Sequence, residues 1–163
     1  MANWCSNTVT FTGNKESTDK IVQLFQTMTE QEEKSGEGQI PDFIQEKNGF
    51  FFEIYQNETD ECSFQYETKW CPNIEALYLI SDHFQTEFVL EYVELGCCIF
   101  ERTTYQNQVL DDICLDFSDF DTYCYDEETY TYQFEEETYD SDTEILEILL
   151  ERKINEETFI ENL

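Results

Sequence analysis

The sequence of 163 residues has little of the residue types on which catalytic sites usually depend. It holds one histidine, His83, and only five glycines. A lone histidine gives no sign of a nucleophile and base pair, and the chain has no P-loop, no G-x-S-x-G motif and no Gly-rich dinucleotide turn. We therefore expect a protein that is not an enzyme.

Basic residues are also scarce, with 8 Lys and Arg against 38 Asp and Glu, a net charge of −30 and a pI near 4.1. Such a surface repels phosphate backbones and anionic lipid heads. The sequence thus predicts no direct binding of nucleic acid or membranes, and it favours a basic protein as the partner. The longest segment without a basic residue is residues 103–151, which hold 16 acidic residues.

Long apolar runs are missing as well. No segment has the 18 or so apolar residues of a membrane helix, and no basic start precedes an apolar run. We therefore expect a cytoplasmic protein. Seven cysteines, an odd number, fit reduced thiols better than a disulfide framework.

Metal sites and cofactors are not expected either. The chain has no C-x-x-C, and the adjacent Cys97 and Cys98 would point to opposite faces of a strand. Asp116, Asp119 and Asp121 are clustered oxygen donors for calcium, but the tract around them lacks the glycine of an EF-hand loop. Weak, incidental calcium binding stays open.

The apolar content is high enough for a folded core, since 40% of residues are hydrophobic and 16% are aromatic. Alternating patterns predict strands at residues 4–13, 50–56, 63–70 and 87–95. Helical periodicity predicts a helix capped by Ser17, a mobile loop over residues 30–42, and a second helix introduced by Pro72 and Asn73. The order βαββαβ is that of an α+β, ferredoxin-like sandwich. Trp4 and Trp70 are expected to be core or fold-defining residues.

Beyond residue 102 the sequence predicts an acidic extension. Strand patterns at residues 97–105 and 109–117 precede a hairpin that turns at residues 126–129. A C-terminal helix opens at Ser141 and Asp142, with Arg152 and Lys153 at its end, where the macrodipole favours cations. We predict two parts, residues 1–102 and 103–163, with the second packed on the same domain.

Three motifs resemble the YubB-type ferredoxin-like proteins of phages, plasmids and other bacterial mobile elements. These are MANWCSN at residues 1–7, TKWCPN at residues 68–73 and EYVELG at residues 91–96. The resemblance covers residues 1–102 and implies the fold and a mobile-element origin. It brings no catalytic residue, and Tyr66, Glu67 and Leu95 depart from the family pattern.

The acidic tract suggests a function. A solvated acidic face would keep a domain soluble, but mixed charges would do so with less self-repulsion. Carboxylates at alternate positions of a strand repeat every ~6.7 Å, about two base steps of ~3.4 Å. We therefore expect an inhibitor of a bacterial defence nuclease, a CRISPR effector or a restriction enzyme, that mimics nucleic acid. The alternative is an acidic interaction module that binds a basic partner without mimicry.

The candidate residues for partner binding share an acidic side chain, except for one aromatic residue expected to stack on arginine. They are Asp116, Asp119, Asp121, Asp126, Glu127, Glu128, Glu135, Glu136, Glu137, Tyr139, Asp140, Asp142 and Glu144. No catalytic or metal-binding residue is assigned.

Overall fold

The computed structural model describes residues 3–46, 48–57 and 62–161, and for residues 158–161 it describes the backbone alone. Met1 and Ala2 of the first motif lie outside this range. The chain forms two compact units. The N-terminal unit comprises Met1–Glu94 and Arg102–Asp112, and the C-terminal unit comprises Leu95–Glu101 and Ile113–Leu163. The predicted division at residue 102 falls inside a strand, Ile99–Gln106, rather than in a linker.

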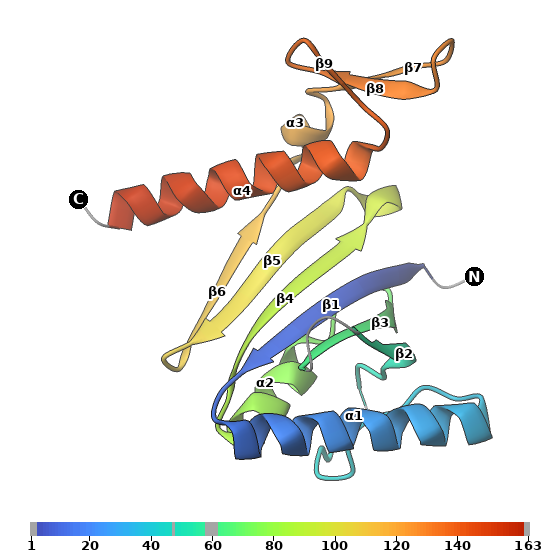
Figure 1. Cartoon of the computed structure of the whole chain (residues 1–163), viewed down its shortest axis with the longest axis vertical. Helices are drawn as coiled ribbons and strands as arrows, with labels where there is room; N and C mark the ends of the chain where they lie inside the picture. Colours follow the sequence, from blue (N-terminus) through green and yellow to red (C-terminus); the bar gives the residue numbers. More distant parts are fainter. Residues whose placement is uncertain (1–2, 47, 58–61, 162–163) are drawn as a thin grey trace. The chain divides into compact units, whose positions relative to one another are not determined.

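The predicted α+β, ferredoxin-like order is confirmed in the first part of the chain. The elements are β1 (Trp4–Thr12), α1 (Lys15–Ser35), β2 (Phe52–Gln56), β3 (Ser63–Lys69), α2 (Ile74–Phe84) and β4 (Glu87–Glu94). Two further strands, β5 (Ile99–Gln106) and β6 (Val109–Cys114), extend the sheet to the order β2-β3-β1-β4-β5-β6. Figure 1 shows α1 and α2 against one face of the four ferredoxin-like strands. β6 is the outermost strand, and its Val109 and Leu110 are exposed.

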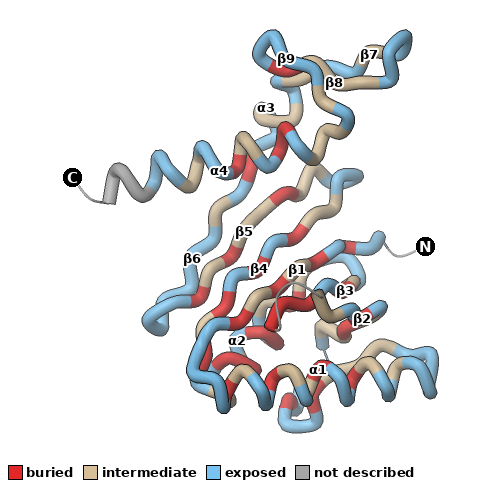
Figure 2. The backbone as a smooth tube through the Cα atoms, in the orientation of Figure 1, coloured by how far each residue is buried: buried red, intermediate tan, exposed pale blue. Residues whose placement is uncertain are grey.

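Alternation along the strands builds the core of the N-terminal unit. Val9 and Phe11 of β1 are buried, while the threonines between them lie on the other face of the sheet, which matches the predicted pattern. The same alternation buries Leu90 of β4. Figure 2 shows buried segments recurring along the strands of this sheet. From the helix side, the ring of Phe25 stacks on Phe64 of β3 with centroids 4.0 Å apart.

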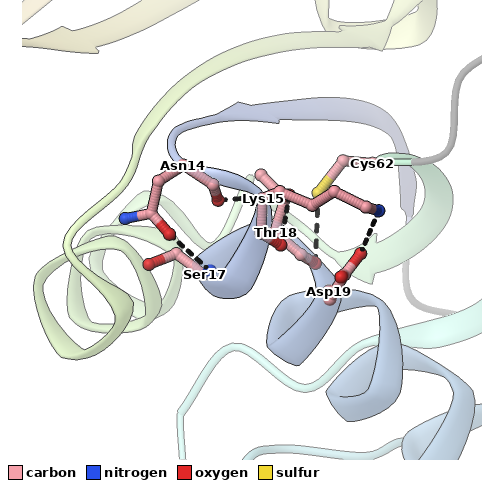
Figure 3. Close-up of polar contacts among 6 residues, drawn as sticks. All are labelled: Asn14, Lys15, Ser17, Thr18, Asp19 and Cys62. Carbon is pink, nitrogen blue, oxygen red and sulfur yellow. Dashed lines mark hydrogen bonds and ion pairs between the residues drawn. The ribbon is translucent and has the colours of Figure 1, made fainter.

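Helix α1 starts earlier and ends later than the sequence predicts. Its N-cap is Asn14, whose side chain accepts a hydrogen bond from the Ser17 amide at 3.0 Å, so Ser17 is not the cap (Figure 3). The helix runs to Ser35 and ends at Gly36, which has the left-handed φ of 69°. Residues 30–35 are therefore helical and not a loop. An ion pair between Glu30 and Lys34, four positions apart, supports this last stretch.

Both tryptophans lie on the surface, which corrects the expectation that they belong to the core. Trp4 is 47% exposed and Trp70 is 60% exposed. Trp4 lies opposite Lys69 in the β1–β3 pair, and the Lys69 ammonium is 5.5 Å from the Trp4 ring centroid. Trp70 follows the end of β3 with a φ of 73°, so its side chain leaves the alternation that would have placed it inside.

Buried polar side chains from two of the family-like motifs meet between β1 and β3. Asn7 donates from Nδ2 to Thr68 Oγ1 at 2.9 Å and to the Cys5 carbonyl at 2.7 Å. Asn7 and Thr68 are both 1% exposed. Because a buried amide without partners is costly, this network favours one register of the two strands. The role of these motif residues is structural.

The C-terminal unit differs from the prediction in several elements. Cys97 ends a short 3-10 turn (Leu95–Cys97) and Cys98 has a φ of 53°, so the strand β5 begins only at Ile99. Residues 117–120 form the short helix α3 (Phe117–Phe120) instead of the end of a strand. The helix α4 (Asp142–Glu161) continues eight residues past Lys153, so Arg152 and Lys153 lie in its middle. None of the described helices has the length and apolar character required to cross a membrane.

Candidate acidic interaction site

A three-stranded antiparallel sheet carries most of the predicted site. Its strands are β7 (Cys124–Asp126), β8 (Thr131–Phe134) and β9 (Glu137–Tyr139), in the order β7-β8-β9. The predicted hairpin is confirmed by the pairing of Tyr125 with Tyr132. The strand β9 was not predicted, because the acidic run of residues 135–137 hides a tight turn between β8 and β9.

Tyrosines hold this sheet together on one face. The ring of Tyr132 in β8 lies 5.0 Å from that of Tyr125 and 5.9 Å from that of Tyr123. Phe134, at the end of β8, is buried. Tyr130 lies in the turn between β7 and β8, has a φ of 59° and is 76% exposed. The contacts between rings on neighbouring strands thus help to hold the sheet together.

The carboxylates do not follow the expected rows along the strands. The three strands carry Asp126 at the end of β7 and Glu137 at the start of β9, and their other residues are uncharged. The other acids of this segment lie in the turns and flanking loops. Like charges placed opposite each other on paired strands repel, which explains why the strand centres hold tyrosine, threonine and glutamine.

Lys153 of α4 forms ion pairs with two of the predicted site residues. Its Nζ lies 2.7 Å from Asp116 Oδ2 and 2.8 Å from Asp119 Oδ2, and it also donates to the Cys114 carbonyl at 3.2 Å. Burial lowers the pKa of Lys153, whereas its bonds to the two carboxylates raise it, and the pKa lies above its ordinary value. Asp116 and Asp119 also form a capping box at the start of α3. This pair of acids therefore fixes local structure.

Arg152 binds a third predicted residue. It donates from Nη1 and Nη2 to the two carboxylate oxygens of Glu135, at 2.8 and 2.7 Å. Its guanidinium carbon also lies 5.5 Å from the ring centroid of Phe134. The hydrogen bond from Arg152 lowers the pKa of Glu135, so this carboxylate stays charged in mildly acidic solution.

Three other acids serve turns and helix starts. Asp126 accepts from the Glu128 amide at 2.9 Å, and this bond lowers the pKa of Asp126. Glu144 accepts from the amides of Asp140 and Ser141, ahead of α4. Glu137 accepts from the Tyr139 hydroxyl at 3.2 Å, so the predicted aromatic residue is joined to an acid of its own strand.

Other members of the predicted set are presented to solvent. Glu127 and Glu128 are exposed in the turn between β7 and β8, and Glu136 is exposed in the turn between β8 and β9. Asp140 is exposed just after β9, and Asp121 is exposed at the end of α3. Asp142, half-buried at the start of α4, raises the pKa of Tyr132 through its charge.

The described residues of this site do not form a metal-binding group. Within the described part of the chain, no group of three or more His, Cys, Asp and Glu side chains is arranged to hold an ion. At the aspartate cluster suggested for calcium, the Lys153 ammonium already bridges Asp116 and Asp119.

A comparison with known families matches residues 49–135, which run from the segment before β2 to the end of β8. The chain belongs to the family described as "Ferredoxin-like domain in Api92-like protein". This ferredoxin-like domain covers just over half of the sequence, and it agrees with the predicted fold class. No curated protein matches the chain, and neither does any solved structure. The YubB-type assignment and the mobile-element origin stay predictions.

Arg152 and Lys153 are the residues of this site that sequence reasoning missed. The sequence predicted Arg152 and Lys153 at the end of a helix, where the macrodipole favours cations. Their adjacency on one helix, directly after a tract without bases, was the available signal, because they and Arg102 are the cations that flank the tract.

Proposed function

We propose that this protein inhibits a bacterial defence nuclease by occupying its basic nucleic-acid-binding surface with the C-terminal unit. The observation that carries the proposal is that the C-terminal unit has many more acidic residues than its own basic residues can pair with. The C-terminal unit holds 18 acidic and 2 basic residues, and both bases are engaged with Asp116, Asp119 and Glu135. The exposed remainder attracts Lys and Arg, and its binding would release counterions from both partners.

Two turns of the three-stranded sheet present this charge. One carries Glu127 and Glu128, and the other carries Glu136. The turns lie at opposite ends of β8, whose four residues span roughly 13 Å at ~3.3 Å each. Strand residues therefore repeat at about the same interval as the ~3.4 Å steps along one nucleic-acid strand. Anionic points at the two ends of such a strand can stand in for phosphates.

The second turn is held in an unfavourable backbone conformation. Glu135 and Glu136 have φ values of 49° and 69°, in the left-handed region that favours Asn and Gly in such turns. Arg152 clamps Glu135, and Glu136 remains at the tip. Retaining two glutamates where Asn-Gly would fold better favours a role for the charge outside folding.

The test is a nuclease assay with a panel of purified CRISPR effector complexes and restriction enzymes. We expect the protein to displace DNA or guide RNA from a target in this panel, with an affinity that falls steeply as salt rises. A triple variant, Glu127→Gln, Glu128→Gln and Glu136→Gln, should lose most of the inhibition. The matched control, Glu30→Gln, Glu33→Gln and Glu37→Gln, removes the same charge from the N-terminal unit and should inhibit normally.

Inhibition that both triple variants lose equally would reject a defined site in the C-terminal unit. Displacement that does not change with salt would reject mimicry. The same assay addresses an origin on a phage or another mobile element, which the proposal includes, because such elements gain from disarming host nucleases.

The alternative function is an acidic interaction module that binds a basic protein without displacing nucleic acid. The exposed Trp4 and Trp70 favour it, because exposed tryptophans are typical of protein interfaces and mimicry leaves them unused. Binding to a basic partner that leaves its nucleic acid in place would select this alternative.

A further inference from the structure

A pocket of about 690 Å³ lies in the N-terminal unit, where α2 and residues 43–46 and 48–49 line it. Its size is in the range of ordinary ligand pockets. All its lining residues belong to the N-terminal unit, so it is separate from the acidic turns. The proposed inhibition makes no use of it.

The pocket is fixed at both ends of the loop. Asn73, at the start of α2, donates to the Gly49 carbonyl at 2.9 Å and accepts from the buried Tyr66 hydroxyl at 2.7 Å. At the other end, the Phe43 ring lies flat on His83, with centroids 4.1 Å apart and planes 7° apart. A pocket held this way loses little conformational entropy when a ligand enters.

The lining combines an apolar floor with an acidic rim. Ile44, Ile74 and Leu79 supply aliphatic surface that could cover the methylene stem of a long side chain. Glu46, Glu75 and Asp82 are exposed lining acids. Among the described lining residues the fixed cation is Lys69, whose ammonium lies 4.6 Å from the Phe52 ring centroid.

The stacked pair of Phe43 and His83 adds a flat aromatic wall beside Asp82. A planar guanidinium can stack on such a wall and still donate to a carboxylate, whereas an ammonium has no flat face. At the other end of the pocket, Asn73 gives the first turn of α2 no side-chain cap. Backbone amides of that turn can donate hydrogen bonds to a peptide carbonyl.

We propose that this pocket receives an arginine side chain presented by a protein partner. The stem lies on the aliphatic floor, the guanidinium stacks on Phe43 and pairs with Asp82, and the peptide carbonyl lies at the start of α2. The net charge of −30 steers a basic protein toward the pocket.

The test is an NMR titration of the full chain with Nα-acetyl-arginine N-methylamide. We expect saturable shifts at the amides of residues 74–76 and 82–83. The matching citrulline compound, which is neutral and of similar shape, should produce none, and the lysine compound should bind more weakly. The double variant Glu75→Gln, Asp82→Asn should weaken binding about tenfold. A control of equal charge, Glu33→Gln with Glu37→Gln, should leave it unchanged.

A second readout is alkylation of the exposed Cys71, which lines the pocket. The blocked arginine should slow modification of Cys71 and leave that of Cys124 unchanged. Equal shifts with citrulline, or shifts spread evenly over α1 and the C-terminal unit, would overturn the proposal. Free arginine binding more than tenfold tighter than the blocked form would also overturn it, because the ligand would then be a small molecule. Neither result bears on inhibition by the acidic turns.

Discussion

The guanidinium of Arg152 and the carboxylate of Glu135 form a two-pronged ion pair that joins α4 to the turn between β8 and β9. Such bidentate geometry is the most favourable arrangement of this pair. Its position matters for the proposed function, because Glu136 follows directly at the tip of the same turn.

Replacing Arg152 with glutamine should lower the thermal midpoint by about 1 to 3 °C, since the pair is exposed and worth little on its own. The coupling is the sharper measure. Glu135→Gln and the double variant should lower the midpoint by about the same amount as Arg152→Gln, because either change breaks the same pair. Additive losses would show that the two side chains act independently.

Acid should remove this contribution. The hydrogen bond from Arg152 lowers the pKa of Glu135 below its unfolded value, which is about 4.3. The stabilisation is therefore present above that pH and is lost as the pH falls through the folded pKa. The difference in thermal midpoint between wild type and Arg152→Gln should be present at pH 7 and should shrink as the pH falls through the folded pKa of Glu135. A gap of constant size would contradict the assigned ion pair.

Glu136→Gly should stabilise the protein by roughly 0.5 to 1 kcal/mol, because glycine adopts a φ of 69° without steric cost. Glu136→Gln is the matched control, since it removes the same charge and keeps the strained backbone. Urea unfolding of the three proteins separates the two effects. In the nuclease assay both variants should lose inhibition to the same extent. Glu136→Gly would then be more stable than wild type and a weaker inhibitor.

Tyr66→Phe should cost about 1 to 3 kcal/mol, because it leaves Asn73 Oδ1 without its buried hydroxyl donor. Tyr55→Phe, at a side chain that is 53% exposed, should stay within ~0.5 kcal/mol of wild type. Urea denaturation measures both. Equal costs would mean that the Tyr66 hydroxyl contributes nothing to the anchoring of Asn73.

Cys5 should resist alkylation that modifies Cys71. Burial raises the pKa of the Cys5 thiol to about 11, and its side chain is inaccessible. At pH 8, iodoacetamide followed by peptide mass spectrometry should label Cys71 within minutes and Cys5 only after denaturation. Labelling of Cys5 at the rate of Cys71 would show that β1 opens in the native protein.

Much of the fold could be predicted because the spacing of apolar residues along the sequence indicates each helix and strand. Val9 and Phe11 alternate with threonines, and Ile21, Phe25 and Met28 share one side of α1. Periodicity fixes which face is buried, and both patterns are confirmed by burial. The ends of elements were less predictable. Asn14, not Ser17, is the N-cap of α1. The polar residues near its end have sufficient helix propensity for the helix to continue to the C-cap Gly36.

The site was only partly predictable for a different reason. Asp116 and Lys153 are 37 positions apart, and nothing local in the sequence indicates that they meet. The acidic tract was therefore treated as one surface, although its members divide into ion-paired, turn-forming and exposed groups. Trp70 shows the same limit, because a single left-handed residue after β3 turned an expected core side chain outward.

The outer strand β6 has a consequence for how the protein behaves in concentrated solution. It lies at an edge of the six-stranded sheet, and Val109 and Leu110 at its start are exposed, which is the kind of edge that pairs with a strand from another molecule. Asp111 and Asp112 follow Leu110 in the same strand, and their charges oppose such edge-to-edge pairing. The surplus charge on which the proposed function depends thus also keeps copies of this chain apart.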